Sequence, residues 1–302
     1  MIPYSGFQLS SEDIEKIKDR NYRRSLAEYI KTHGAQPDDE TAYSFRTVSA
    51  EDIEAERRIL YAFRSPNPKA SHDWSQDPLT FEILSAGKLV LTSRYTPYYS
   101  YNKIIEIKKN NQEWEEVLFE GWCQEEISVV AGDTVQFRAD SDTSYAYYNF
   151  SSTCDFNILG NLMSLRSKTN FSNMNFSGNM QGLFSYCTGL IDASYLVLPA
   201  VPNDDYAYSY MFENCTNLMA APILSSTDAT TSGSYCYRGM FYNCKKLSEL
   251  TCLMEVNGSN NRTSNWLYGV SNTGRFIKSP NSNWIEGSSG IPSGWTIVDY
   301  EE

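Results

Sequence analysis

Histidine and cysteine supply most nucleophilic and metal-binding chemistry in proteins, and this chain holds few usable combinations of them. Its 302 residues include only two histidines, His33 and His72, both in the polar N-terminal third. A Ser-His-Asp or Cys-His active site therefore has little to draw on. The cysteines are odd in number, and none forms a CxxC pair with a histidine nearby, so neither a zinc site nor a disulfide framework is indicated. We predict no catalytic residue, no metal site and no cofactor.

Carboxylates offer a further route to catalysis, because a pair of them cleaves glycosidic bonds in many enzymes. Asp192, Asp204, Asp205 and Glu213 lie near the repeated segments in the second half of the chain. Acidic residues on surface loops are more often simply solvated. A glycan-active enzyme stays an alternative, and the prediction is that the chain is not an enzyme.

Tyrosine is the side chain that the composition favours for binding. The chain has 22 Tyr, 14 Phe and 6 Trp against 25 Lys and Arg together. Tyrosine combines apolar area with a polar group and loses little entropy when fixed, which suits a contact surface, whereas β-structure also favours aromatics. The candidate ligand-binding residues are Tyr206, Tyr208, Tyr210, Asn214, Tyr235, Tyr237 and Tyr242. Interior packing is the alternative for each tyrosine, and alternation in YAYSY and YCYRG predicts that some point inward and some outward.

Net charge limits the partners. The formal charge is −12 and the pI about 4.8, which argues against nucleic acid because phosphate binding needs clustered Lys and Arg. The first 30 residues lack a secretory signal, and no run of 18 apolar residues occurs. We therefore expect a soluble chain without an export signal and without membrane insertion.

Three segments of the chain have similar sequences, and the candidate tyrosines lie within or next to them, so the fold of these segments must position the tyrosines. LFSYCTGL begins at Leu183, MFENCTNL at Met211 and MFYNCKKL at Met240, so the phenylalanines are 28 and then 29 residues apart. Such a period predicts a solenoid whose matching residues stack in columns. Cys187 and its counterparts would form one buried column, either as reduced thiols, which we favour because no export signal is seen, or as disulfides.

Short β-runs separated by turn residues precede the repeats. LTFEIL, GKLVLTS, IIEIKK, EWEEVLF, EISVV and TVQFRAD follow Pro78 in order. Asn110-Asn111 stands between IIEIKK and EWEEVLF, where a hairpin turn would fall, and Ala131-Gly132-Asp133 separates EISVV from TVQF. These runs predict a small antiparallel sandwich.

The N-terminal segment has the pattern of helices. Ser10 or Ser11 would cap one helix and Ser49 another, which would end near Phe63. Such a segment either docks on another protein or packs on its own chain. We therefore expect an α+β multidomain chain, with a helical attachment region at 1–64, a linker at 65–77, a β-sandwich at 78–157 and a capped repeat domain at 158–298.

The repeat unit resembles BspA-like leucine-rich repeat proteins of gut Bacteroides-type bacteria and their tailed phages, whose unit is MFxxCxxLxxAPxLP. The likeness to the repeats covers about residues 158–298, including an entry segment GNLMSL and a closing segment GIPSGWTIVD, and the strand-rich region from about residue 78 resembles the domain that precedes such repeats. This chain departs from the pattern by having three clear repeats and no AP segment after Leu247. The resemblance implies a short solenoid and is weak evidence of function.

Members without a signal peptide are similar to virion fibre or decoration proteins of tailed phages. The resemblance therefore implies a virion protein that attaches to other virion proteins through residues 1–64, in several copies or as a homo-oligomer. Its repeats would bind a host-surface glycan or protein by multivalent weak contacts. Two alternatives are a virion cement protein that never touches the host and a bacterial surface adhesin.

Overall fold

In the computed structural model, the described residues are Lys18 and 72–94, 103–119, 123–139, 147–169, 171, 180–199, 205–225, 234–254 and 261–300. The chain divides into two compact units, Met1–His72 and Asp73–Glu302. Apart from Lys18, the predicted N-terminal helices lie outside the described residues, as does most of the predicted linker. The last residues of that linker form a short 3-10 helix, η2 (Trp74–Gln76), capped by the Asp73 carboxylate, which accepts a hydrogen bond from the Ser75 amide.

The α+β fold class is wrong for the described part of the chain, which is all-β. It contains three sheets of six, three and three strands, and no helix there reaches seven residues. The reason lies in the period of the apolar residues. In Thr134–Ala139, for example, half-buried and buried side chains alternate, which is the two-residue period of a strand. In the described part, no helix is long and apolar enough to cross a membrane.

The first nine strands, β1 to β9 (Leu190–Val197), form two packed sheets. Six of them coincide with the six predicted β-runs, and the sheet orders are β4-β3-β6-β1-β8-β9 and β5-β2-β7. The aromatic rings of Phe81 on β1, Phe137 on β6 and Phe150 on β7 join the two sheets, with centroids 4.7 to 5.3 Å apart. The other eight strands are β1 (Leu79–Ile83), β2 (Gly87–Arg94), β3 (Lys103–Lys109), β4 (Glu115–Phe119), β5 (Gln124–Val129), β6 (Thr134–Ala139), β7 (Tyr147–Ser152) and β8 (Phe156–Asn161).

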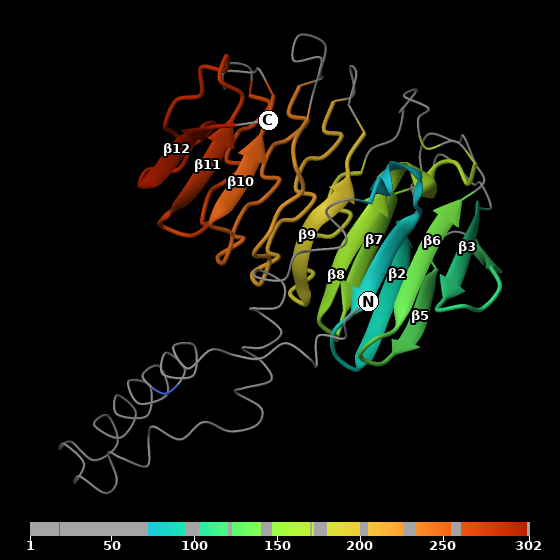
Figure 1. Ribbon diagram of the computed structural model, residues 1–302. Helices are drawn as coiled ribbons and strands as arrows, with labels where there is room; N and C mark the ends of the chain where they lie inside the picture. The colour runs from blue at the N-terminus through green and yellow to red at the C-terminus, as the bar shows by residue number, and fades with distance from the viewer. Residues whose placement is uncertain are drawn as a thin grey trace, which may run out of the picture. The chain divides into compact units, whose positions relative to one another are not determined.

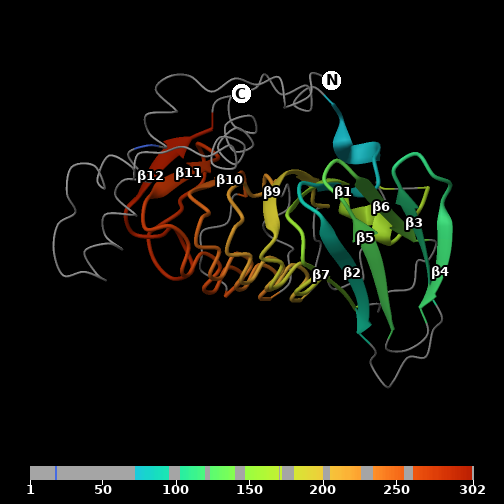
Figure 2. The ribbon, with the colours of Figure 1, turned by 90° about the horizontal axis from the view of Figure 1, so that it is seen from below.

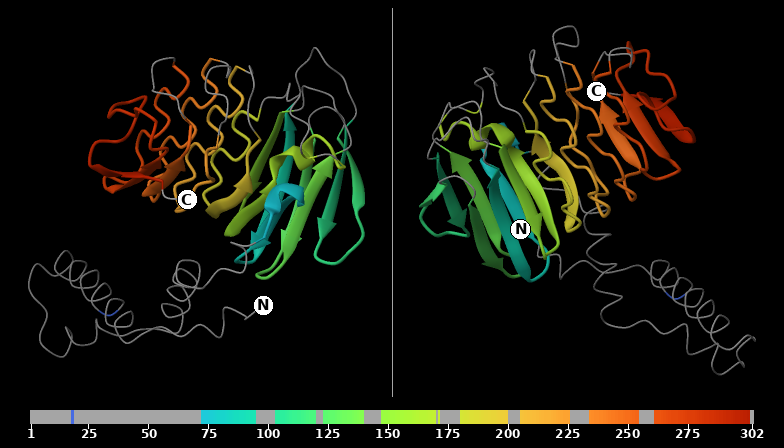
Figure 3. Two further views of the ribbon diagram at one scale, coloured as in Figure 1. Left: turned by 45° about the horizontal axis from the view of Figure 1, so that its top comes forward. Right: turned by 180° about the vertical axis from the view of Figure 1, so that it is seen from behind.

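Strand β8 changes the direction of pairing. It runs antiparallel to β1 on one side and parallel to β9 (Leu190–Val197) on the other. A 3-10 turn, η3 (Leu162–Leu165), follows β8. Parallel pairing then continues in β10 (Glu249–Cys252), β11 (Gly274–Lys278) and β12 (Trp295–Asp299), and single bridges at Ala220 and Leu224 connect β9 with β10. The yellow to red coils therefore continue from the green sheets (Figures 1 and 3).

The other side of each coil is a run of turns rather than a strand, and successive coils lie in register there (Figure 2). Alternate amides of one coil donate to the next coil, as from Tyr208 to Cys236 and from Phe212 to Met240. The amides between them donate within the coil, as from Met211 to Tyr208. Backbone polar groups are thus satisfied without a strand, as burial demands.

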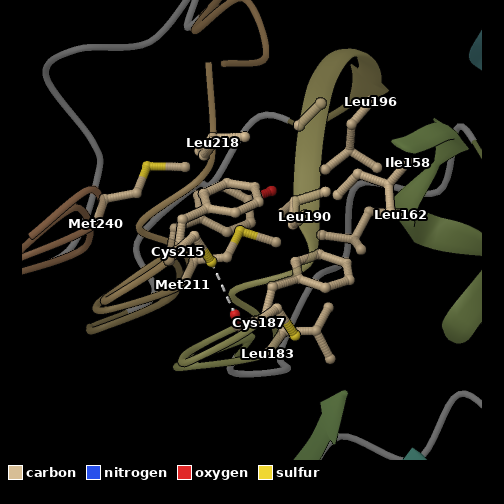
Figure 4. Packing of buried hydrophobic residues seen from close by; sticks show 14 of the residues in the cluster. Ile158, Leu162, Leu183, Cys187, Leu190, Leu196, Met211, Cys215, Leu218 and Met240 are labelled. Atoms are coloured by element: carbon tan, nitrogen blue, oxygen red, sulfur yellow. Dashed lines mark hydrogen bonds between the residues drawn. The ribbon is translucent and has the colours of Figure 1, made fainter. Parts of the chain in front are cut away.

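Two columns of side chains fill the coils. The rings of Phe150, Phe184, Phe212 and Phe241 stack at centroid distances of 5.4 to 5.5 Å and within 15° of parallel. The Sγ atoms of Cys187, Cys215 and Cys244 each donate to the carbonyl of the preceding phenylalanine in this stack, at 3.0 to 3.1 Å. The predicted cysteine column is confirmed, with the thiols free, and Figure 4 shows the Cys215 bond. Since Phe150 belongs to β7, one core runs from the sheets into the coils.

Three tryptophans close the far end of this core. Trp266 and Trp284 stack at 5.1 Å, and Phe276 meets both rings edge-on. Each indole N–H has a carbonyl partner: Trp266 donates to Gly290, Trp284 to Met254 and Trp295 to Ser271. These bonds let large aromatic side chains cover the last coil without burying an unpaired donor.

Candidate binding surface

The turn side of the coils has a regular backbone pattern. Every fourth residue there has a positive φ, between 54° and 75°. Most of these positions hold Gly or Asn, the residues that adopt left-handed backbone most easily. They are Gly182 and Tyr186, then Tyr206, Tyr210 and Asn214, then Tyr235, Gly239 and Asn243, and finally Asn261, Asn265 and Gly269.

Four tyrosines occupy left-handed positions: Tyr186, Tyr206, Tyr210 and Tyr235. A side chain with a Cβ costs about 1 to 2 kcal/mol in this backbone region. Neighbouring coils lower or avoid this cost at matching positions, with Asn214, which tolerates left-handed backbone better, beside Tyr186 and Gly239, which has no Cβ, beside Tyr210. Strain of this kind often marks residues kept for a role other than stability.

Three of these tyrosines form a cluster with Arg238, which we call the tyrosine–arginine cluster (Tyr206, Tyr210, Tyr235 and Arg238). The rings of Tyr206 and Tyr235 stack at 5.3 Å and 10°. The Arg238 guanidinium lies 5.4 Å from the Tyr235 ring and 5.6 Å from the Tyr210 ring. Each is a cation–π distance.

Glycine makes room for this cluster. A Cβ added to Gly239 would stand 2.4 Å from the Tyr210 ring, and Gly239 also has a φ of +58°. The ring of Tyr210 therefore lies directly over the backbone of the next coil. Both the position and the conformation require glycine here.

Amide and tyrosine side chains extend the surface next to the cluster. The Asn243 side-chain amide donates to the Asn214 side-chain oxygen at 2.6 Å. Tyr242 stacks on Tyr268 at 5.1 Å, and Tyr268 is 60% exposed. Tyr186 is 65% exposed. The surface thus presents aromatic rings and hydrogen-bonding groups on at least three successive coils.

Two of the sequence-predicted candidates are core residues. Tyr208 and Tyr237 are buried, and their rings lie 5.8 Å apart in the interior. The Tyr208 hydroxyl donates to the Pro199 carbonyl, and burial raises the pKa of Tyr237 well above its usual range. For these two, the structure shows the interior-packing alternative. Tyr206, Tyr210, Tyr235, Tyr242 and Asn214 all retain exposed surface.

Sequence reasoning missed Tyr186, Tyr268, Asn243 and Arg238. The aligned segments contained a signal for two of them, because Tyr186 and Asn243 hold the same place in the repeat as Asn214. Arg238 and Tyr268 gave no such signal, since their relation to the tyrosines arises only when the coils stack.

The carboxylates of the alternative hypothesis have separate structural settings. The Asp192 carboxylate accepts from the Ser194 amide, and the Asp205 carboxylate from the Ser234 amide. Partial burial raises the pKa of Glu213. Asp204 lies outside the described residues. Within the described ranges, no group of three or more His, Cys, Asp or Glu side chains is placed to hold a metal ion.

Comparisons with protein-family models, with curated proteins and with solved structures each find no match to this chain. The resemblance to BspA-like repeats therefore rests on the motif residues alone and stays a prediction.

Proposed function

We propose that this chain is a non-enzymatic binding protein whose turn surface (Tyr186, Tyr206, Tyr210, Asn214, Tyr235, Arg238, Tyr242, Asn243 and Tyr268) binds a host-surface glycan. On the motif resemblance, we place it in a phage virion as a fibre or decoration protein attached through residues 1–64. Several copies on one particle would turn weak single contacts into firm attachment.

The observation that carries the proposal is the placement of tyrosine at strained positions. Four tyrosines have left-handed backbone at positions where other coils hold Gly or Asn. The strained backbone lowers the stability of the fold, whereas the tyrosine rings add exposed aromatic area that a ligand can contact. Exposed aromatic rings beside amides and hydroxyls provide the contacts that sugar rings use, namely an apolar face and hydrogen-bonding edges.

The C-terminal end of the coil stack favours a second candidate, a bridging or cement protein. Ile285 is 68% exposed and Ile297 is 43% exposed, and Ile297 belongs to β12, the last strand of its sheet among the described residues. Exposed apolar residues beside a sheet edge suit a protein partner. On this reading, Ile285→Lys and Ile297→Lys would prevent incorporation into particles and leave glycan binding unchanged.

The test of the main proposal is adhesion of the full chain to Bacteroides-type cells before and after enzymatic removal of surface glycans. Binding that falls at least about tenfold after removal is expected for multivalent glycan contacts. Binding that persists on stripped cells, or no binding to any strain, would contradict the glycan proposal. The same adhesion measurement with Tyr208→Phe is the control. This variant loses one buried hydroxyl and no surface tyrosine, so it shows how far a small loss of stability alone changes adhesion.

A further inference from the structure

Arg238 differs in its partners from six other basic side chains of the described residues. Six basic side chains pair with a carboxylate at 4 Å or less, and these are Lys88, Lys109, Arg138, Lys168, Arg275 and Lys278. Arg238 makes no such ion pair with any described carboxylate. Its guanidinium lies instead near two tyrosine rings.

The backbone on both sides of Arg238 is held firmly. Its amide donates to the Tyr235 carbonyl, which closes a turn. Its carbonyl accepts from the Tyr210 amide at 2.8 Å and from the Ser209 hydroxyl at 3.2 Å. The side chain is half-buried between rings on two coils. An arginine held this way loses less conformational entropy on binding than a free surface arginine.

The chemistry of the guanidinium indicates its ligand. Arginine presents a planar array of donors that fits a carboxylate, sulfate or phosphate with two parallel hydrogen bonds. The adjoining Tyr206 and Tyr235 rings offer apolar area for the carbon face of a sugar. Overall electrostatics would not attract an anion here, because the whole chain carries a formal charge of −12. Anion binding would therefore depend on this local cation.

We propose that the tyrosine–arginine cluster binds an acidic sugar residue, with Arg238 receiving the anionic group and Tyr206 and Tyr235 packing against the ring. This inference rests on the proposed glycan-binding function and specifies its ligand class. Arg238 is then a specificity-determining residue.

The test uses the full chain on immobilised polysaccharides in matched pairs. Polygalacturonate is paired with its carboxyl-reduced form, a sialylated glycan with its desialylated form, and a sulfated glycan with its desulfated form. At least one acidic member is expected to bind about tenfold or more better than its neutral counterpart, since charge-assisted hydrogen bonds are the strong ones. The pair that shows the difference identifies the anionic group.

Two variants locate the effect. Arg238→Gln removes the cation and should abolish the preference for the acidic member, with an unchanged thermal midpoint. Arg275→Gln is the control, because Arg275 is an exposed arginine on β11 that pairs with Glu249 at 3.3 Å. It removes the same charge and should leave the preference intact.

The outcomes separate the two proposals. Equal binding to acidic and neutral members, or an acidic preference that Arg238→Gln leaves intact, overturns the acidic-sugar proposal while glycan binding stands. No binding to any glycan, together with unchanged adhesion to stripped cells, overturns the proposed function itself.

Discussion

The outward tyrosines of the turn surface are held by an unusual backbone. In YAYSY, Tyr206 and Tyr210 keep exposed surface and Tyr208 is buried, and in YCYRG, Tyr235 is outward and Tyr237 is buried. The alternation predicted from sequence is confirmed for these residues. The left-handed backbone of the outward tyrosines was not predictable, because tyrosine has no preference for it. Only Asn and Gly at matching positions of other coils hinted at it.

Tyr186→Asn tests the strain at single-residue resolution. Tyr186 has a φ of 65° and is mostly exposed, so asparagine should relieve the strain and raise stability by about 1 kcal/mol. Chemical denaturation measures the change. Tyr268→Asn is the control, since Tyr268 is equally exposed without a positive φ, and it should be neutral or destabilising. A loss of stability in Tyr186→Asn would show that the ring stabilises the coil.

The cysteines predict a reactivity pattern. Six of the seven are buried and Cys123 is half-buried. Burial raises the pKa of the Cys187 and Cys215 thiols and brings that of Cys252 to about 12, so little thiolate exists at neutral pH. A thiol-specific reagent should label at most one cysteine in the native chain and all seven after denaturation. Cys123→Ser should remove the native reaction, and rapid labelling of two or more native thiols would contradict this packing.

At the scale of elements, the alternation of apolar and polar residues predicted six strands, β1 to β6, and missed the other strands. β7 and β8 were missed because YYNFSS and FNILGN carry aromatic, polar and glycine residues without clear alternation. The turn run of each coil was also missed, since its hydrogen bonds go to the neighbouring coil. The turns at Asn110 and Gly132 were predicted correctly, and both residues have positive φ. The first closes the β3–β4 hairpin, whereas the second joins β5 to β6, which lie in different sheets. Local turn chemistry is visible in sequence, whereas partners between coils are not.

One of these turns carries a pH-dependent contribution to stability. The Asn110 side-chain amide donates to Asp133, the Val130 amide donates to its other oxygen, and Lys109 lies 2.9 Å away. These contacts hold the pKa of Asp133 at about 2, below its usual value and against the effect of burial. Because the folded pKa is lowered, the stabilisation is present at neutral pH and is lost as pH falls from about 4 towards 2.

Asp133→Asn should therefore lower the free energy of unfolding by about 2 kcal/mol at neutral pH, and by less near pH 3. Urea unfolding at the two pH values measures this difference. Glu126→Gln is the control, because the Lys88–Glu126 pair is about half exposed on both sides and should contribute little. A deficit in Asp133→Asn that stayed constant with pH would contradict the assigned contacts.

At the scale of the whole molecule, the sheets and the coils share one core. The phenylalanine column starts at Phe150 on β7, and the thiol of Cys187 donates to the Phe150 carbonyl. The motif could not reveal this, because the segment around Phe150 lacks the MFxxC pattern of the repeats. The predicted boundary between residues 157 and 158 falls inside β8. The α+β class is wrong for the described part, and the helices on which it depended, before residue 64, lie outside the described residues apart from Lys18.

The central claim is that the strained tyrosines serve binding. Its most direct measurement is glycan-dependent cell adhesion by the full-length variant Tyr186→Asn, Tyr206→Asn, Tyr235→Asn, together with its thermal midpoint. Asn261 already fills the position next to Tyr235 in the following coil, so the backbone accepts asparagine there. We expect adhesion to fall at least about tenfold, as multivalent contacts fail together, while the midpoint stays the same or rises. Full adhesion in a folded variant would contradict the account.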